Sequence, residues 1–353
     1  MAVSPFDDPL LSGLLGDEEI APQFSPEAGF EELNYFEEAL ARAEAEEGLI
    51  PEAAANAISL ACAAFEPDAA LVRQAATRDG VIVPEYVRQL RERIGPPHAA
   101  HLHFGATSQD LIDTSLVRRL LPVVAIFDTR LAALVSSLDD LARRFGGNSL
   151  MGRTRTQDAL PITAADRIAA WRGPLVRDRE RLAQIKPRLL VLQFGGAAGT
   201  RDKLGAKGEA VARRLAYALG LPPAPAWHSQ RDNLAEFAAW LALVSGSLGK
   251  IGADVALMAQ NAIGEVALAG AGGSSAMAHK ANPVAAEVLV ALARHNATLS
   301  AAMMHALVHE QERSGAAWTL EWLTLPQMVI TTAAGLRTAL ALLASVTRLG
   351  ARG

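Results

Sequence analysis

Cysteine is almost absent from this chain: Cys62 is the single cysteine among 353 residues. One thiol excludes a disulfide framework and a cysteine-rich metal site, and it suits a reducing compartment. Aromatic residues are also scarce, at 5% of the total, whereas 50% of the residues are hydrophobic. This composition predicts a folded globular protein that favours helix over strand.

A strong charge of either sign is also missing. The chain has 33 Lys and Arg residues against 38 Asp and Glu residues, so no broad basic surface for nucleic acid is expected. The first ten residues, MAVSPFDDPL, are acidic rather than basic, which argues against a signal peptide. The most apolar stretches carry Arg, Asp or Glu within about 20 residues, so no bilayer-spanning segment is predicted. We therefore expect a cytoplasmic protein without nucleic-acid or membrane partners.

Helical periodicity dominates the second part of the chain. Short helical pieces between residues 30 and 95 are separated by Gly48, Pro51, Pro67 and Gly80. The predicted fold class is all-α, a bundle of five long central helices at residues 111–353 that follows a small helical domain at residues 1–110. The long helices are expected at residues 111–145, 164–194, 232–268, 283–312 and 317–349.

Several of these long stretches are rich in Ala, Leu and Val around much of their circumference. A helix that is apolar on more than one face needs more than one neighbour. Oligomerisation through the bundle is therefore expected. A large monomeric bundle is the alternative.

Polar residues gather where the predicted long helices stop. The first such break is HLHFGATSQD at residues 101–110. Free backbone N–H groups and the helix dipole would favour an anion there, although a plain N-cap by Thr107, Ser108 or Asp110 explains the same residues. The second break, MGRTRTQD at residues 151–158, alternates arginine with threonine. Arginine grips carboxylates in bidentate fashion, and a solvated charged loop is the alternative.

The third break is GAGGSSAMAHKANP at residues 270–283. Its glycines give backbone freedom, Lys280 supplies a cation, and Asn282 offers both a donor and an acceptor. Pro283 is favoured at a helix start. A flexible linker or a phosphate-binding loop would share these features, but no Gly-Lys-Ser/Thr sequence follows the glycines, which argues against a nucleotide P-loop.

Histidines occur in two groups that invite a metal interpretation. His305 and His309 lie one helical turn apart, yet no third ligand of a suitable type is apparent. The group His98, His101 and His103 lies among prolines and small residues, which favours loop or pocket histidines. No metal and no other cofactor is predicted.

Taken together, the breaks resemble the fumarase/aspartase superfamily, which includes class II fumarase and the adenylosuccinate and argininosuccinate lyases. The runs that carry the resemblance are GATSQD at 105–110, GRTRTQ at 152–157 and GSSAMAHKANP at 273–283. The third run departs from the family signature at Ala278, which replaces a proline. Within the superfamily the chain looks most like the 3-carboxy-cis,cis-muconate cycloisomerase branch, through HFGATSQD, GRTR and the run WTLEW at 318–322.

This resemblance implies a homotetramer whose active sites each take motifs from three subunits, and a C-terminal small domain that is short or absent. It places the catalytic acid or base at Ser274, with Lys280 stabilising the alkoxide. The substrate is expected to be a small polycarboxylate. The residues expected to bind it are Thr107, Ser108, Arg153, Arg155, Gln157, Ser275, Asn282, Glu287 and Arg313.

Arg155 stands where most lyases of the superfamily carry a histidine with a general-acid role. Arginine stays protonated up to pH ~12, so it cannot protonate a leaving group. Lactonisation does not need that acid, because a carboxylate attacks the conjugated double bond and a proton is delivered to carbon. The predicted reaction is therefore cycloisomerisation of 3-carboxy-cis,cis-muconate to 4-carboxymuconolactone in protocatechuate degradation. An adenylosuccinate-type lyase releasing fumarate and a non-catalytic structural relative are the alternatives.

Overall fold

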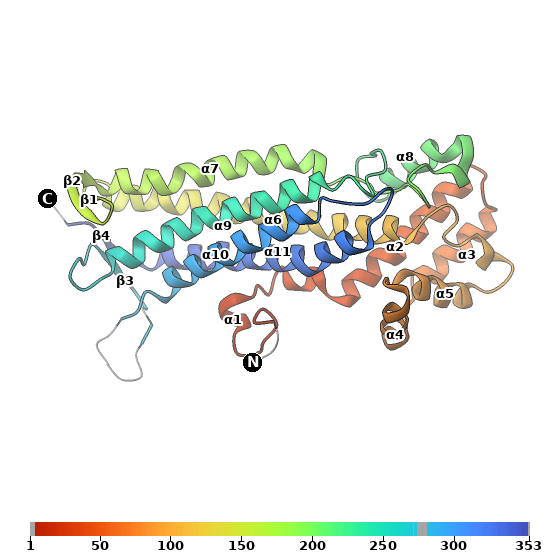
Figure 1. Cartoon of the computed structure of the whole chain (residues 1–353), viewed down its shortest axis with the longest axis horizontal. Helices are drawn as coiled ribbons and strands as arrows, with labels where there is room; N and C mark the ends of the chain where they lie inside the picture. The colour runs from red at the N-terminus through yellow and green to blue at the C-terminus, as the bar shows by residue number, and fades with distance from the viewer. Residues whose placement is uncertain (1–3, 271, 274–280, 352–353) are drawn as a thin grey trace.

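Long parallel and antiparallel helices form an elongated bundle with a smaller group of helices at one end (Figure 1). The computed structural model describes residues 4–270, 272–273 and 281–351. The all-α fold class is confirmed. The bundle helices are α6 (Ser108–Phe145), α7 (Ala164–Leu189), α9 (Asp232–Met258), α10 (Val284–His305) and α11 (Gly315–Ala344).

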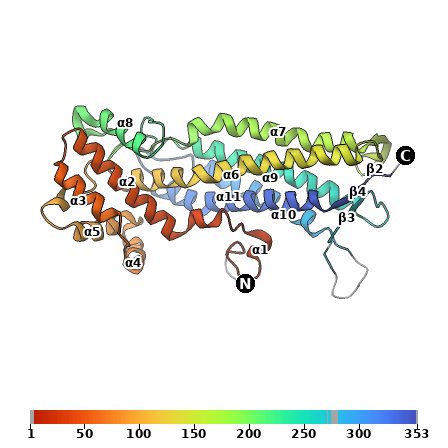
Figure 2. The same cartoon turned by 180° about the vertical axis from the view of Figure 1, so that it is seen from behind.

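The smaller group of helices contains most of the first hundred residues. The predicted breaks at Gly48, Pro51, Pro67 and Gly80 fall between its helices and are confirmed. Two later elements, η3 (Asp202–Lys207) and α8 (Gly208–Ala218), join this group, and α8 packs on α2 (Figure 2). The elements of the first hundred residues are α1 (Ser12–Leu15), η1 (Ala21–Phe24), α2 (Pro26–Glu46), α3 (Glu52–Cys62), α4 (Ala69–Asp79), α5 (Val83–Ile94) and η2 (His98–His101).

Four of the five predicted long helices are shorter than the sequence indicated. The predictions placed the ends of α7, α9, α10 and α11 at residues 194, 268, 312 and 349, whereas these helices end at residues 189, 258, 305 and 344. One reason is long-range strand pairing: β3 (Val266–Leu268) pairs antiparallel with β4 (Val346–Leu349). Such pairing overrides local helical composition, because a strand is stabilised by its partner rather than by its own propensity.

The second polar break is a β-hairpin, so a loop prediction for this segment is wrong. Strands β1 (Ser149–Thr154) and β2 (Gln157–Thr163) pair antiparallel. The connecting residues Arg155 and Thr156 both have left-handed φ angles, 50° and 65°. Left-handed residues at both central positions make a tight two-residue turn whose twist matches that of the strands.

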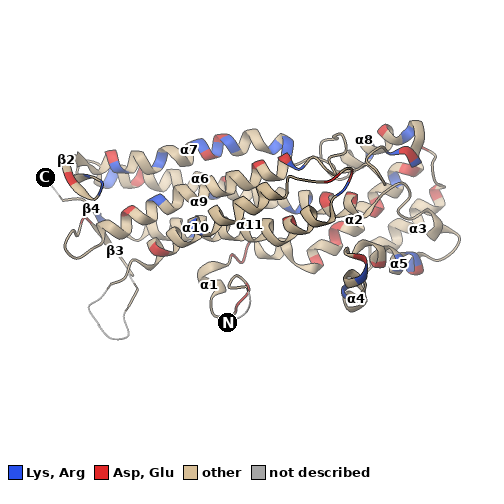
Figure 3. Cartoon of the chain, in the orientation of Figure 1, with Lys and Arg blue, Asp and Glu red and all other residues tan. Residues whose placement is uncertain are grey.

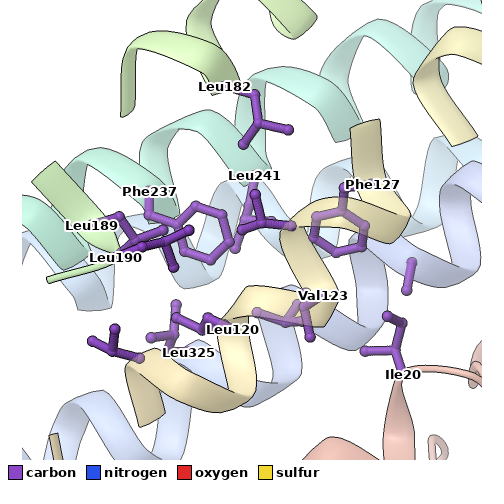
Figure 4. Packing of buried hydrophobic residues seen from close by; sticks show 14 of the residues in the cluster. Ile20, Leu120, Val123, Phe127, Leu182, Leu189, Leu190, Phe237, Leu241 and Leu325 are labelled. Carbon is purple, nitrogen blue, oxygen red and sulfur yellow. The ribbon is translucent and has the colours of Figure 1, made fainter. Parts of the chain in front are cut away.

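Buried aliphatic and aromatic side chains from α6, α7, α9 and α11 interlock along the bundle (Figure 4). Phe127 of α6 and Phe237 of α9 are fully buried, and each contacts the ring of Trp240. Gly252 lets α10 approach α9 closely, because a Cβ atom there would lie 2.4 Å from the Ala286 oxygen. Burial of each large side chain contributes roughly 1.5–3 kcal/mol to folding.

Three bundle helices, α6, α9 and α11, are long and apolar enough to cross a membrane by length and composition alone. The prediction that no segment would meet this criterion is therefore wrong. In the structure these helices pack against one another, and 72% of the most apolar window of α11 is buried. Their apolar residues supply the helix–helix contacts of the bundle.

Candidate active site

The first polar motif lies where α6 begins, beside the loop 192–201, the segment 226–231 and the start of α11; we call this region the α6 end. Thr107 is the N-cap of α6 in an extended conformation, and its N–H donates to the Asp110 carboxylate at 3.0 Å. Asp110 also accepts from the N–H groups of Gly195 and Gly196 at 2.8 and 2.9 Å. The N-cap interpretation is thus confirmed, and Asp110 fixes the loop 192–201 to α6.

A buried imidazole completes the environment of Asp110. His228 Nε2 lies 2.8 Å from Asp110 Oδ1, and both side chains are almost completely buried. His228 Nδ1 has no hydrogen-bond partner within the described part of the chain. Sequence reasoning missed this pair, because 118 residues separate its members and no motif marks the histidine.

Arg231 occupies the centre of a buried ionic network at the α6 end. Its guanidinium lies 2.5 Å from the Asp113 carboxylate and 2.6 Å from that of Glu321, and Trp318 Nε1 donates to Asp113 at 3.1 Å. Burial favours a lower pKa for Arg231, but the two facing carboxylates outweigh it and raise the pKa above its usual range. The same contacts lower the pKa of Glu321 against the effect of burial. The run WTLEW therefore joins α11 to α6 and α9.

Arg313 lies at the α6 end with Thr107 and Ser108. Its Nε donates to Gln109 Oε1 at 2.9 Å, and its Nη2 donates to the Ala197 oxygen at 3.2 Å. Gln109 is fully buried, and its amide nitrogen donates to Asp113 and to the backbone oxygen of His228. The exposed Arg313 is thus oriented by a buried amide. The sequence predicted Arg313 but gave no signal for this role of Gln109.

Just before α6, His103 has a left-handed φ of 60° and its Nδ1 lies 2.5 Å from Glu37 Oε1. The loop interpretation of this histidine is confirmed. A second buried carboxyl, Glu44, lies two turns further along α2. Burial, and then the nearby Glu37, raise the pKa of Glu44 to about 9, so it keeps its proton at neutral pH.

The second motif lies at the opposite end of the bundle, which we call the hairpin end and which contains the β1–β2 and β3–β4 pairs. Arg155 and Gln157 are exposed at the tip of the hairpin, and neither side chain has a partner among the described residues. Arg153 differs, because Glu265 and Asp158 hold its guanidinium at 2.9 Å. The two arginines that looked equivalent in the sequence therefore have different environments.

The described residues of the third motif also lie at the hairpin end. Gly272 and Asn282 form an antiparallel bridge with N···O distances of 2.9 and 2.8 Å, and Asn282 Nδ2 donates to the Gly273 oxygen. Glu287 is exposed in the first turn of α10. The predicted residues Ser274, Ser275 and Lys280 lie outside the described residues.

The two ends lie far apart within one chain (Figure 1). Helix α6 connects them and has 38 residues, which gives a length of roughly 57 Å at ~1.5 Å per residue. A small molecule cannot contact both ends of the same chain. A cavity of about 750 Å³ beside α2 contains none of the predicted site residues. The candidate residues therefore form two separate groups, one at each end of the bundle.

The chain is similar to known proteins over nearly its whole length. The profile of a family described as Lyase matches residues 17–295. A 3-carboxy-cis,cis-muconate cycloisomerase of Pseudomonas aeruginosa is 43% identical over 91% of this chain and 71% of that protein. One from Bradyrhizobium diazoefficiens is 40% identical over 93% of this chain and 74% of that protein. The crystal structure of the 3-carboxy-cis,cis-muconate lactonizing enzyme from Pseudomonas putida superposes with a TM-score of 0.90 at 38% identity, covering 96% of this chain and 77% of that one.

Proposed function

The chain belongs to the lyase family of the fumarase/aspartase type, and from this membership we infer that it is a 3-carboxy-cis,cis-muconate cycloisomerase. It closes the muconate to a lactone in aromatic catabolism. The observation that carries this conclusion is identity of 40% and 43% to enzymes of that name over more than 90% of the chain. The free cation at Arg155 agrees with it, because lactonisation needs a grip on carboxylates and no acid for the leaving group.

The chemistry proposed for the site depends on the negative charges of the substrate and on the cations that stabilise them. A substrate carboxylate attacks the conjugated double bond and forms the C–O bond of the lactone, and the Ser274 hydroxyl delivers a proton to the carbon next to another carboxylate. Negative charge develops as an enolate-like species, which Lys280 and Asn282 stabilise. Arg155 and Arg313 hold the remaining carboxylates, and Ser275 also contacts the substrate. Gln157 and Glu287 contact it from the hairpin end, and Thr107 and Ser108 from the α6 end.

A cytoplasmic homotetramer with shared active sites is part of the proposal. The length of α6 supports this part of the proposal. It keeps the candidate residues of the two ends apart in one chain, whereas neighbouring copies in an assembly could bring the two ends together. Helices α9, α10 and α11 carry few charges compared with α7 (Figure 3). Large apolar side chains on these helices are exposed in the single chain, among them Leu243, Leu257, Met304 and Leu323. Burial of such side chains would stabilise an assembly.

The activity is tested by following the diene absorbance of 3-carboxy-cis,cis-muconate in a spectrophotometer. Loss of the absorbance with formation of the lactone is expected. Adenylosuccinate serves as the comparison substrate, and no release of fumarate is expected from it. Turnover of adenylosuccinate together with a stable muconate absorbance would contradict the assigned reaction.

Sharing of the site is tested by mixing two variants that are each strongly impaired. Arg155→Gln damages the hairpin end and Arg313→Gln damages the α6 end. If each site combines the two ends from different subunits, random co-assembly leaves about a quarter of the sites intact, so activity returns in the mixture. If hybrid assemblies form but the mixture is no more active than the two variants alone, sharing of the site between subunits is contradicted.

A further inference from the structure

Arg153 is the most strongly engaged arginine of the hairpin. Its Nη1 lies 2.9 Å from each oxygen of the Glu265 carboxylate, and its Nε lies 2.9 Å from Asp158 Oδ1. The Arg153 side chain is 28% exposed and that of Glu265 is 14% exposed. Charge-assisted contacts of this kind are stronger and better oriented than those between freely solvated side chains. Two carboxylates therefore engage Nη1 and Nε of the guanidinium within the described structure.

Glu265 is a rigidly held partner. Its N–H donates to the Met258 oxygen at the end of α9 at 2.9 Å, and its own oxygen accepts from Gly350 at 2.8 Å. Glu265 also leads directly into β3, which pairs with β4. The backbone that carries its carboxylate is thus held by contacts with two other segments of the chain.

The outer half of the hairpin has little other attachment. Within the described chain, Arg153 is the one side chain among residues 152–160 with a polar bond to a residue outside the hairpin. Nearly every residue of β2 is exposed. The register shifts between Gly152 and Arg153, and irregularities of this kind redirect side chains. The shift coincides with the position at which the hairpin is tied to Glu265.

We propose that Arg153 is a positioning residue rather than a substrate contact: its ion pair with Glu265 holds the hairpin so that Arg155 and Gln157 stay in one place. The assignment rests on the proposed function only in that Arg155 and Gln157 meet the substrate there. Arg153 and Arg155, which are two positions apart in the sequence, thus have different functions. Arg153 holds the hairpin on its own chain, and Arg155 is left free for a carboxylate.

The substitution Glu265→Gln separates the two interpretations by the sign of its effect. It preserves shape and removes the charge that holds Arg153. A positioning role predicts that KM rises about tenfold, as it also does in Arg153→Gln, with a much smaller change in kcat. A substrate-binding role for Arg153 predicts an unchanged or lower KM, because the competing carboxylate is gone. An unchanged or lower KM in Glu265→Gln would overturn the proposal.

Exchange of the two charges adds a second measurement. Arg153→Glu alone places two carboxylates together, and the added Glu265→Arg should recover most of the lost activity. A double variant as impaired as Arg153→Glu alone would contradict the proposal. Arg179→Gln, which breaks the half-exposed ion pair between Arg179 of α7 and Asp128 of α6, is the matched control and should keep the wild-type KM.

Amide hydrogen exchange of the hairpin gives a readout that does not depend on the reaction. The amides of β1 and β2 should exchange about tenfold faster in Arg153→Gln and in Glu265→Gln, but not in Arg179→Gln. Wild-type protection in both hairpin variants would overturn the positioning role. If the wild type fails to convert carboxymuconate, the proposed function fails, while this measurement still tests the ion pair.

Discussion

The two ends of the bundle use their charged residues in different ways. At the α6 end, Asp113, Arg231 and Glu321 satisfy one another in the interior. At the hairpin end, Arg155 is exposed and unpaired within the described structure. Buried charges must be paired because desolvation is costly, so they fix geometry. Exposed charges remain available for a ligand, so they contribute little to folding.

This difference teaches that one end of the bundle is fixed by its buried charges, whereas the other end presents an exposed charge. The α6 end is organised before any ligand arrives, because Gln109 transmits the position of the buried network to Arg313. The hairpin end presents its residues on a short strand pair whose turn is conformationally strained. Mutations at the α6 end should therefore change the stability of the fold, whereas mutations at the hairpin end should change substrate binding.

The largest effect is expected from Arg231→Met. The substitution leaves Asp113 and Glu321 buried without their cation, so the free energy of unfolding should fall by about 3–5 kcal/mol. Urea denaturation at fixed protein concentration measures it. Arg172→Gln, which breaks the half-exposed pair with Asp139, is the control and should change stability by no more than about 0.5 kcal/mol. If the free energy of unfolding of Arg231→Met falls by less than about 1 kcal/mol, the buried ionic network contributes little to the stability of the fold.

The buried carboxyls of α2, next to the α6 end, predict a pH effect. The folded protein keeps the Glu44 proton up to about pH 9, whereas the unfolded chain loses it near pH ~4.3. Ionisation therefore favours unfolding, and the contribution of Glu44 to stability falls as pH rises between these values. Glu44→Gln removes this loss. The stability of the variant relative to wild type should increase by about 2–4 kcal/mol from pH 5 to pH 8.

Thermal or urea unfolding across this pH range measures the Glu44 effect, because the contributions of all other groups cancel in the difference. Glu31→Gln, at an exposed position of α2, is the control and should follow the wild-type pH dependence. Parallel curves for Glu44→Gln and wild type would show that Glu44 titrates normally.

The third comparison uses the two candidate carboxylate anchors. Arg155→Gln and Arg313→Gln should each lower kcat/KM by about 10–100-fold, since each would remove one of the proposed charge-assisted bonds to substrate, worth about 1.5–3 kcal/mol. The two variants should differ in their free energy of unfolding. Arg155→Gln should fold as well as wild type, whereas Arg313→Gln leaves the buried Gln109 oxygen unpaired and should lose about 1 kcal/mol. Equal stability of the two variants would remove the structural distinction between the ends.

The smallest effect is expected in the hairpin turn. Thr156 has a left-handed φ of 65°, which a β-branched residue adopts at a cost and glycine adopts freely. Thr156→Gly should raise the free energy of unfolding by about 0.5–1 kcal/mol. Thr154→Gly, on a regular strand position, is the control and should lower it by about 0.5–1 kcal/mol. A destabilised Thr156→Gly would show that the turn carries no strain.

Local signals were sufficient for much of the fold. Glycine and proline positions such as Gly48 and Gly80 marked the helix boundaries in the first hundred residues, because they act on the backbone directly. The predicted helix ends at Leu268 and Leu349 were wrong, because these residues belong to β3 and β4, two strands that pair with each other over a large sequence separation. The same limit applied to the site: Arg313 was recognised, whereas its partner Gln109 lies 204 residues away.

The order of residues along the chain determined the all-α class, the three polar motifs and the family, because helical periodicity and short motifs are encoded locally. Tertiary structure decided which charges are available. Arg153 and Arg155 are two positions apart and chemically identical, yet Glu265 holds Arg153, whereas the Arg155 side chain has no partner in the part of the chain that the structure describes. The physical reason is that a charge acquires its role from the carboxylates and solvent around it, and folding brings those neighbours together from distant parts of the chain.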